Sequence, residues 1–254
     1  MSETTSAVIS EVKRRTGRDV VVSPSPGLQT ISTVKMAGGS LPAHVIRYRP
    51  DAAAHVDYLI VVHCGFILRG FEKEHEAQVI VPSDRGKADV AKLVAAAPFV
   101  GQLGLGEPQL NQLRDQFLNG LIIHLRSIPI GMRVDAWIRQ DYPDLAAMQK
   151  TVVARQIQEN QGTLAASVRQ MVPSRIFDAT AAINAAFALF WSAAWKEDAL
   201  VLPYRAAGYE QVGRRLLAIF EEVPGAASGD RELVNRWADV LGLKDWYSWV
   251  NLPA

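Results

Sequence analysis

Three side chains with chemical potential lie in one apolar stretch, YLIVVHCGFILRGFE, at residues 58–72. His63 can accept a proton or bind a metal ion, Cys64 is the only thiol of the chain, and Arg69 can bind a carboxylate or phosphate. Neighbouring side chains on a helix point about 100° apart, so His63 and Cys64 do not form a Cys–His dyad. The stretch is therefore expected to be either a catalytic helix or a core helix that contains a histidine.

The core-helix interpretation needs no chemistry from these residues. Gly65 would let another segment pack closely, Cys64 would behave as a small apolar side chain, and His63 would be a buried imidazole with a hydrogen-bond partner. Arg69 would lie near the C-terminal end of the helix, where a positive charge is favoured. Both interpretations remain open at this point.

The segment IVVHCGFILR, residues 60–69, resembles the catalytic helix of zincin-type metallopeptidases in the form I-x-H-E-C-G-H-I-L-R. In H-E-x-x-H, two histidines on one helix face bind Zn²⁺ and the glutamate acts as general base. Matching the Cys-Gly pair puts Val62 and Phe66 at the two histidine positions and His63 at the glutamate position. Because valine and phenylalanine have no lone pair for zinc, the metal site implied by the resemblance is degenerate.

A second segment, SIPIGMRVDAWIRQDYPDLAAMQ at residues 127–149, is similar to one found in some zincin-like bacterial proteins. There a helix with the pattern P-x-D-x-x-I-E-x-W-L supplies a carboxylate ligand. Gly131 stands at the aspartate position and Asp135 at the glutamate position. The resemblance therefore implies a zincin-like domain that has lost its zinc ligands, although Asp135 could still ligate a metal.

The function implied by this resemblance is that of a catalytically inactive zincin-like protein, a regulatory or protein- or peptide-binding module without a cofactor. In active zincins the extended substrate pairs with the edge strand beside the catalytic helix. We therefore expect HVIRYRP, residues 44–50, to be an edge strand that pairs with a partner's strand. Arg47, Tyr48 and Arg69 are the candidate binding residues, and another protein or a peptide is the expected partner.

Two other functions stay open. The first is a metal-dependent hydrolase with a non-standard site, built from His63 and Asp135 together with His44 or His124. The second is a helical scaffold unrelated to zincins, which acts through a C-terminal surface that contains three of the six tryptophans. That tryptophan-rich end must be buried, and we expect it to pack against its own domain. Metal content would separate the first alternative from the inactive scaffold.

The elements that would position these residues give an α+β fold, mainly α-helical with a small N-terminal β-sheet. β-Branched runs between glycines and prolines predict strands at 20–22, 28–36, 44–50 and 77–82. Helical periodicity predicts helices at 4–16, 51–72, 84–97, 107–127, 130–141, 144–171, 174–197, 205–222 and 229–241. Asp51 is the expected N-cap of the helix that carries His63. We expect a single domain over 1–254, with a mixed part at 1–100 and a helical part at 101–254.

Composition excludes several classes of function. Lys and Arg number 27 against 26 Asp and Glu, which gives no electrostatic case for binding nucleic acid. One cysteine cannot form an internal disulfide, and the N-terminus lacks an apolar run, so a cytoplasmic protein is predicted. The most apolar segment, 178–198, contains Asn184 and Ser192 and predicts a buried helix rather than a membrane span.

An E-x-x-H motif at 72–75 is half of the motif that di-iron helix bundles use twice. The sequence contains no second copy, so the motif predicts a solvated helix end.

Overall fold

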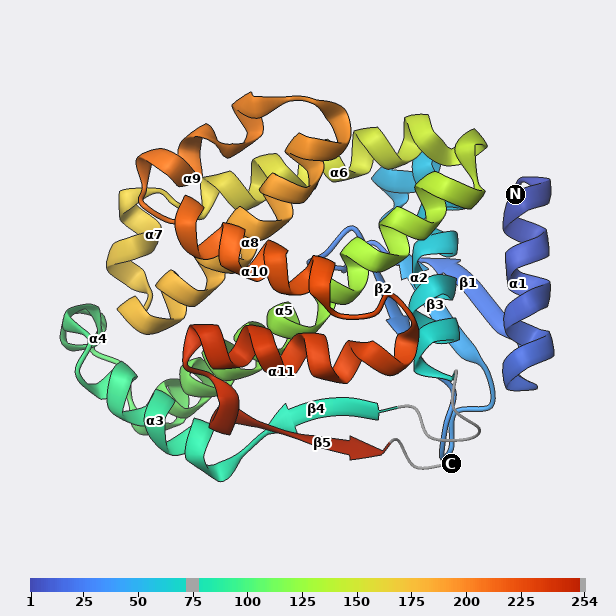
Figure 1. Cartoon of the computed structure of the whole chain (residues 1–254). Helices are drawn as coiled ribbons and strands as arrows, with labels where there is room; N and C mark the ends of the chain where they lie inside the picture. The colour runs from blue at the N-terminus through green and yellow to red at the C-terminus, as the bar shows by residue number, and fades with distance from the viewer. Residues whose placement is uncertain (72–77, 252–254) are drawn as a thin grey trace. The chain divides into compact units, whose positions relative to one another are not determined.

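The computed structural model describes residues 1–71 and 78–251, and these residues are mainly helical (Figure 1). The α-helices are α1 (Glu3–Thr16), α2 (Val56–Gly70), α3 (Asp84–Ala95), α4 (Pro98–Leu103), α5 (Glu107–Asp141), α6 (Ala146–Gly162), α7 (Ala166–Met171), α8 (Ser174–Trp195), α9 (Leu202–Ala206), α10 (Glu210–Glu222) and α11 (Asp230–Leu241). The strands are β1 (Val20–Pro24), β2 (Ser32–Lys35), β3 (His44–Tyr48), β4 (Gln78–Pro82) and β5 (Tyr247–Asn251). Short 3-10 helices are η1 (Pro50–His55), η2 (Pro143–Leu145), η3 (Asp198–Val201), η4 (Ala227–Gly229) and η5 (Lys244–Trp246). The expected mainly helical fold with a small sheet is confirmed.

The chain forms two compact units, each assembled from segments that are distant in sequence. Unit 1 consists of Met1–Val79, Ile130–Ala154 and Asn251–Ala254, and unit 2 consists of Ile80–Pro129 and Arg155–Val250. Helices α5 and α6 each supply residues to both units. The strand-rich N-terminal region therefore folds with the second half of α5 and the first half of α6.

The sheet of unit 1 places β3 in the centre, in the order β1-β3-β2. Ile46 of β3 has Val22 of the parallel strand β1 on one side and Val34 of the antiparallel strand β2 on the other. The prediction that 44–50 forms an edge strand is therefore wrong. Alternating β-branched residues identify a strand, but they do not specify which neighbours it pairs with. The edges of this three-stranded sheet are β1 and β2.

One face of this sheet is covered by helices. His44 and Ile46 are fully buried, whereas Val45 is half-buried and Arg47 is exposed, as the alternation of a strand requires. Helix α2 packs against β3 and β2, and α1 packs against α2 and β1 (Figure 1). Val21, which lies on the same face as Arg47, is 49% exposed, so the opposite face of the sheet is open to solvent.

The helix that carries His63 begins later than expected. Asp51 lies inside the 3-10 helix η1, and its carboxylate accepts a hydrogen bond from Arg49 Nε at 2.9 Å. Proline favours the first turn of a helix, so Pro50 starts the helical path before Asp51 can act as a cap. The α-helix α2 starts at Val56, and its N-cap residue His55 makes no side-chain capping bond. The prediction that Asp51 caps the helix is therefore wrong.

Gly65 allows α2 and the second half of α5 to pack closely within unit 1. A Cβ atom at Gly65 would lie 2.5 Å from Val134 Cγ1 and 3.2 Å from Trp137 Cζ3. Atoms of larger side chains cannot occupy this space without moving α5 or its side chains. The close packing expected from a glycine in an apolar helix is confirmed.

We expect Gly65→Ala to lower the free energy of unfolding by about 1–3 kcal/mol, because the added methyl group overpacks the contact. Gly120 is an exposed position of α5 where an added Cβ meets nothing within 4 Å. There the same substitution should raise the free energy of unfolding by roughly 0.5–1 kcal/mol through better helix propensity. Urea unfolding of the two variants measures both effects. Similar effects at both positions would contradict the close contact.

Four predicted helices differ from the structure in three ways, each with an identifiable reason. The segments 107–127 and 130–141 form the single helix α5, which contains Pro129 and tolerates the loss of one backbone hydrogen bond. The expected helix 144–171 is divided into α6 and α7 after Gly162. The expected helix 205–222 is interrupted by Gly208, whose φ of 84° is left-handed.

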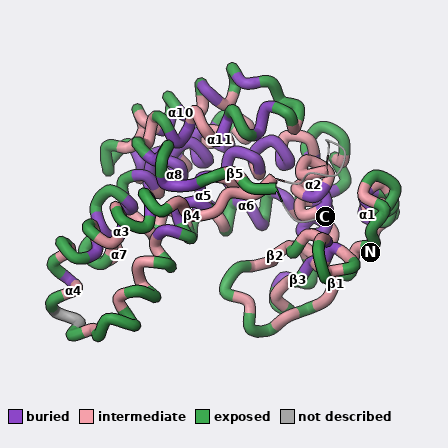
Figure 2. Tube along the Cα trace, turned by 90° about the horizontal axis from the view of Figure 1, so that it is seen from below, coloured by how far each residue is buried: buried purple, intermediate pink, exposed green. Residues whose placement is uncertain are grey.

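Helix α8 is the central helix of the core of unit 2. Most of its residues are buried (Figure 2). Trp191 is fully buried. Among the residues that the structure describes, two segments, Pro50–Gly70 and Ser174–Trp195, have the length and the apolar composition of a membrane-spanning helix. A core helix of a globular protein has the same properties, and 78% of the most apolar window of Ser174–Trp195 is buried within the protein.

The tryptophan-rich C-terminal segment packs within unit 2, as predicted. Trp237 on α11 is fully buried, and its Nε1 donates to the backbone oxygen of Leu216 at 2.9 Å. Trp246 is 1% exposed and packs closely against Gly86 of α3. The strand β5 that follows pairs with β4, a pairing that the sequence pattern did not predict.

Candidate functional site

His63 contacts the edge strand β2 of unit 1. Its Nε2 lies 2.8 Å from Ser32 Oγ, and burial lowers the pKa of the imidazole to about 4. The buried Nδ1 has no hydrogen-bond partner among the described residues. A serine beside a histidine is the geometry of a nucleophile and its base, but a base needs a pKa near the working pH and a group that orients it. His63 is therefore a neutral polar contact between α2 and β2 and a weak base.

Asp135 lies in a buried polar network that joins three helices. Tyr58 OH of α2 donates to Asp135 Oδ1 at 2.6 Å. Gln149 Nε2 of α6 donates to the same oxygen at 3.1 Å and to the backbone oxygen of Asp135 at 3.0 Å. Burial raises the pKa of Asp135 to about 6, while the two side-chain hydrogen bonds act in the opposite direction. Burial beside this carboxylate also raises the pKa of Tyr58 well above its ordinary value.

The hydrogen bonds of His63 and Asp135, the two candidate catalytic residues, run to different partners. Tyr58, which binds Asp135, is five residues from His63, so the two side chains leave α2 about 140° apart. One face of α2 therefore contacts the sheet through His63, and another contacts α5 through Tyr58.

The other two histidines of the hydrolase hypothesis lie elsewhere. His44 Nδ1 accepts from Ala37 N at 3.0 Å, and its Nε2 lies 3.1 Å from Thr16 Oγ1. Burial lowers the pKa of His44 to about 4. His124 belongs to unit 2, where its Nε2 lies 2.8 Å from Asn184 Oδ1. Each of these imidazoles is engaged in its own local hydrogen bonds.

Three of the aligned positions, Val62, Phe66 and Gly131, have no metal-binding side chain, and two of these three lie close together. An added Cβ at Gly131, the aspartate position, would lie 3.5 Å from Cζ of Phe66, the second histidine position. The phenyl ring thus occupies the space between α2 and the second half of α5. Within residues 1–71 and 78–251, no group of three or more His, Cys, Asp and Glu side chains could hold a metal ion. The E-x-x-H at 72–75 lies outside the described residues.

The remaining candidate residues do not share one surface. Arg47 is exposed on the open face of the sheet, whereas Tyr48 lies on the helix-covered face and is half-buried. Arg69 is half-buried in the last turn of α2. Cys64 is fully buried, and burial raises the pKa of its thiol to about 12, so the thiolate that a nucleophile needs is not formed at neutral pH.

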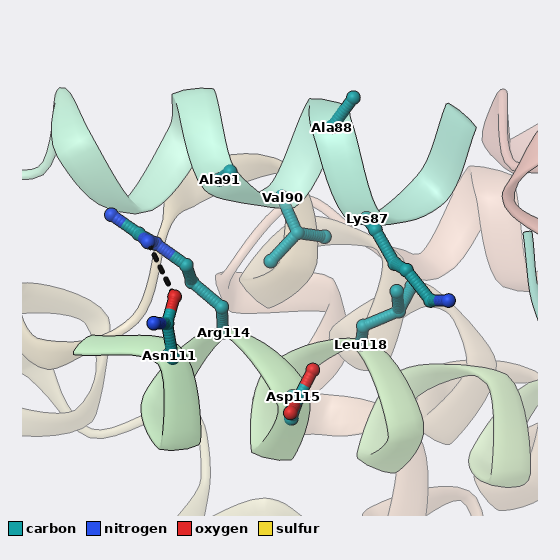
Figure 3. Close-up of a pocket in the computed structure, with 8 residues that line it drawn as sticks. All are labelled: Lys87, Ala88, Val90, Ala91, Asn111, Arg114, Asp115 and Leu118. Carbon is teal, nitrogen blue, oxygen red and sulfur yellow. Dashed lines mark hydrogen bonds between the residues drawn. The ribbon is translucent and has the colours of Figure 1, made fainter. Parts of the chain in front are cut away.

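A cavity of about 410 Å³ in unit 2 was not indicated by the sequence. It lies between α3 and α5, with Lys87 from one helix and Arg114 from the other (Figure 3). Arg114 Nη1 donates to Glu107 and to Asn111, each at 2.7 Å, and Asp115 also lines the cavity. Both signs of charge are present and Arg114 is paired, so the cavity has no strong preference for an anion or a cation. The sequence could not indicate this cavity, because it does not show that the helices α3 and α5 pack against each other.

No model of a known protein family, no curated protein and no solved structure matches the chain. The resemblance to zincins therefore depends on the two sequence segments around His63 and Asp135.

Asp135 should give the protein a measurable pH dependence of stability. The pKa of Asp135 in the folded protein is about 6, above the ordinary value of 3.8. The contribution of this carboxyl group to the free energy of unfolding is therefore fully present below about pH 3.8 and is lost as the pH rises through 6. Asp135→Asn keeps an acceptor oxygen for Tyr58 but cannot titrate. We expect the variant to gain roughly 2–3 kcal/mol of unfolding free energy relative to the wild type between pH 4 and pH 7.

Urea unfolding of both proteins across this pH range measures the difference. Buried histidines such as His63 titrate in both proteins, so their opposite, acid-destabilising contribution cancels. Asp84→Asn is the matched control, since the Asp84 carboxylate is fully exposed. A pH-independent difference for Asp135→Asn would contradict a buried, titrating carboxyl group.

Proposed function

We propose that unit 1 is a catalytically inactive zincin-like scaffold that binds an extended peptide or protein segment along β2. The observation that supports this proposal most strongly is the contact between Ser32 of the edge strand β2 and His63 of α2. A short antiparallel edge strand thus runs beside the helix that resembles a catalytic helix. Val62, Phe66 and Gly131 occupy three of the aligned positions and cannot bind zinc, which leaves Asp135 as the one residue at an aligned ligand position that could.

The backbone of β2 offers hydrogen-bonding groups to such a segment. Arg49 N donates to the oxygen of Ile31 at 2.9 Å, and Thr33 is paired with Arg47. In an antiparallel ladder, hydrogen-bonded pairs alternate with non-bonded ones, so the N–H and C=O groups of Ser32 and Val34 point away from β3. Thr30 Oγ1 donates to the backbone oxygen of Ser32 at 3.1 Å, so this oxygen already has a partner. The outward N–H and C=O groups of Val34 are therefore the best placed for pairing with an added strand.

The proposed scaffold should purify without stoichiometric zinc. His63 and Asp135 would supply only two of the four ligands of a tetrahedral site, and they face different partners. Elemental analysis of protein prepared without a metal-binding tag measures the content, with His124→Ala as a control in unit 2. About one zinc per chain that is lost on His63→Ala would overturn the proposal and favour the metal-dependent hydrolase.

Proline substitutions test the edge of β2 directly. Val34→Pro removes an outward N–H and should leave the β2–β3 ladder intact, because proline is tolerated on an edge strand when its N–H would face away from the sheet. Thr33→Pro removes an N–H that bonds to β3 and should destabilise unit 1. We expect peptides selected on the wild type from a random-sequence display library to bind Val34→Pro about tenfold more weakly, for one lost backbone hydrogen bond.

Val34→Ala is the matched control, since it shortens the side chain and keeps the N–H. Circular dichroism and urea unfolding establish that Val34→Pro and Val34→Ala remain folded. The proposal fails if the library yields no peptide, or if selected peptides bind Val34→Pro and Val34→Ala equally well.

A further inference from the structure

A second cavity in unit 2 has the composition of a small-molecule site. It measures about 380 Å³ and is formed by α5, the C-terminal end of α6, α7 and α8. This volume lies at the lower end of the range for ligand pockets, about 300–1,000 Å³. Aromatic and aliphatic side chains dominate its lining, among them Phe117, Leu121, Ile176 and Phe177. None of its described lining residues is Asp, Glu, Lys or Arg.

The polar part of this lining contains donors that lack acceptors. Asn184 is 1% exposed, and its Oδ1 lies 2.8 Å from His124 Nε2. Burial lowers the pKa of His124 to about 4, so the neutral imidazole donates Nε2–H to Asn184. The amide nitrogens of Asn184 and Asn160 are buried and have no hydrogen-bond partner among the described residues. Buried amide donors of this kind are rare in proteins and call for an acceptor.

The missing acceptor is best supplied by an uncharged oxygen. A carboxylate or phosphate would lose its hydration in an apolar cavity whose lining holds no cation to compensate. A carbonyl oxygen accepts hydrogen bonds from amide N–H groups without carrying a charge. The hydrogen bond from His124 fixes Asn184 with its amide nitrogen directed away from the imidazole, so the acceptor would approach that nitrogen.

We propose that this cavity binds a small, uncharged, mostly apolar molecule through a carbonyl oxygen that accepts hydrogen bonds from the Asn184 side-chain amide, with Asn160 as a second donor. The apolar body of the ligand would lie against Phe117, Leu121 and Phe177. This site lies within unit 2 and does not depend on the proposed function of unit 1.

Matched probe molecules test the proposal on the full-length protein. Each set contains an anilide, the N-alkylaniline in which a methylene group replaces the carbonyl and which is also uncharged at neutral pH, and the analogue with a carboxylate. We expect the amide to bind at least about tenfold more tightly than either analogue, because an analogue that lacks the acceptor leaves the buried donors unpaired. Calorimetry measures the dissociation constants, and shifts of the side-chain amide resonances of Asn184 and Asn160 locate the site.

Asn184→Leu should reduce amide binding about tenfold and leave the methylene analogue unaffected, because it replaces the donor with an apolar group of similar size. Asn111 lines the cavity between α3 and α5, so Asn111→Leu is the matched control and should bind the probes like the wild type. Circular dichroism checks folding, and Asn160→Leu provides a second donor variant if Asn184→Leu does not fold. The proposal is wrong if no amide binds below millimolar concentration, if a carboxylate binds best, or if the carbonyl makes no difference.

Discussion

The close contact at Gly65 determines the arrangement of unit 1. Because a Cβ atom would lie 2.5 Å from Val134, only glycine lets α2 and α5 pack at this separation. The same approach brings Tyr58 within 2.6 Å of Asp135, and a buried carboxyl group needs such partners to offset its desolvation. Gln149 then ties α6 to the same oxygen. The helix that carries His63 is thus held against α5 by shape and by a buried polar network.

The opposite side of α2 is held by the sheet. The central strand β3 contributes the fully buried Ile46, and the edge strand β2 contributes Ser32, which contacts His63. Because α2 packs against α5 on one side and against the sheet on another, its polar residues have separate structural roles. Tyr58 bonds to Asp135 of α5, and His63 contacts Ser32 of β2. His63 and Asp135 therefore have locations that suit stability better than shared catalysis, and β2 is the edge strand whose Ser32 contacts α2.

Sequence reasoning predicted the elements better than their pairing. The periodicity of 4–16 and 174–197 was sufficient to predict α1 and α8, and Gly65 was correctly expected to permit close packing. The same patterns could not show that β3 is central, because a strand's alternation is independent of the order of its neighbours. Pro129 suggested a helix boundary, yet the helix continues through it, since packing on both sides can outweigh one lost hydrogen bond.

The site residues were harder to predict for a related reason. His63 and Asp135 were singled out by type and spacing, whereas their hydrogen-bond partners Ser32 and Tyr58 depend on which faces of α2 meet the sheet and α5. Likewise, His124 and Asn184 are sixty residues apart, and only the packing of α5 on α8 pairs them. Neighbours in space decide whether a buried polar group already has a hydrogen-bond partner or can bind a ligand. A candidate site can therefore be recognised only after the packing of the helices is known.

On the proposed inactive zincin-like scaffold, packing must supply the stability that a bound metal ion would contribute. A zinc ion would cross-link α2 to α5, and on the proposed zincin-like scaffold the contact of Phe66 with the Gly131 backbone position supplies an apolar substitute at the aligned positions. Replacing buried polar or ionic groups by well-packed apolar ones is often neutral or stabilising. Packing at Gly65 and Phe66, together with the Tyr58–Asp135 bond, can thus maintain the helix beside β2 without a metal. The proposed binding of a peptide along β2 would require this geometry alone and no metal chemistry.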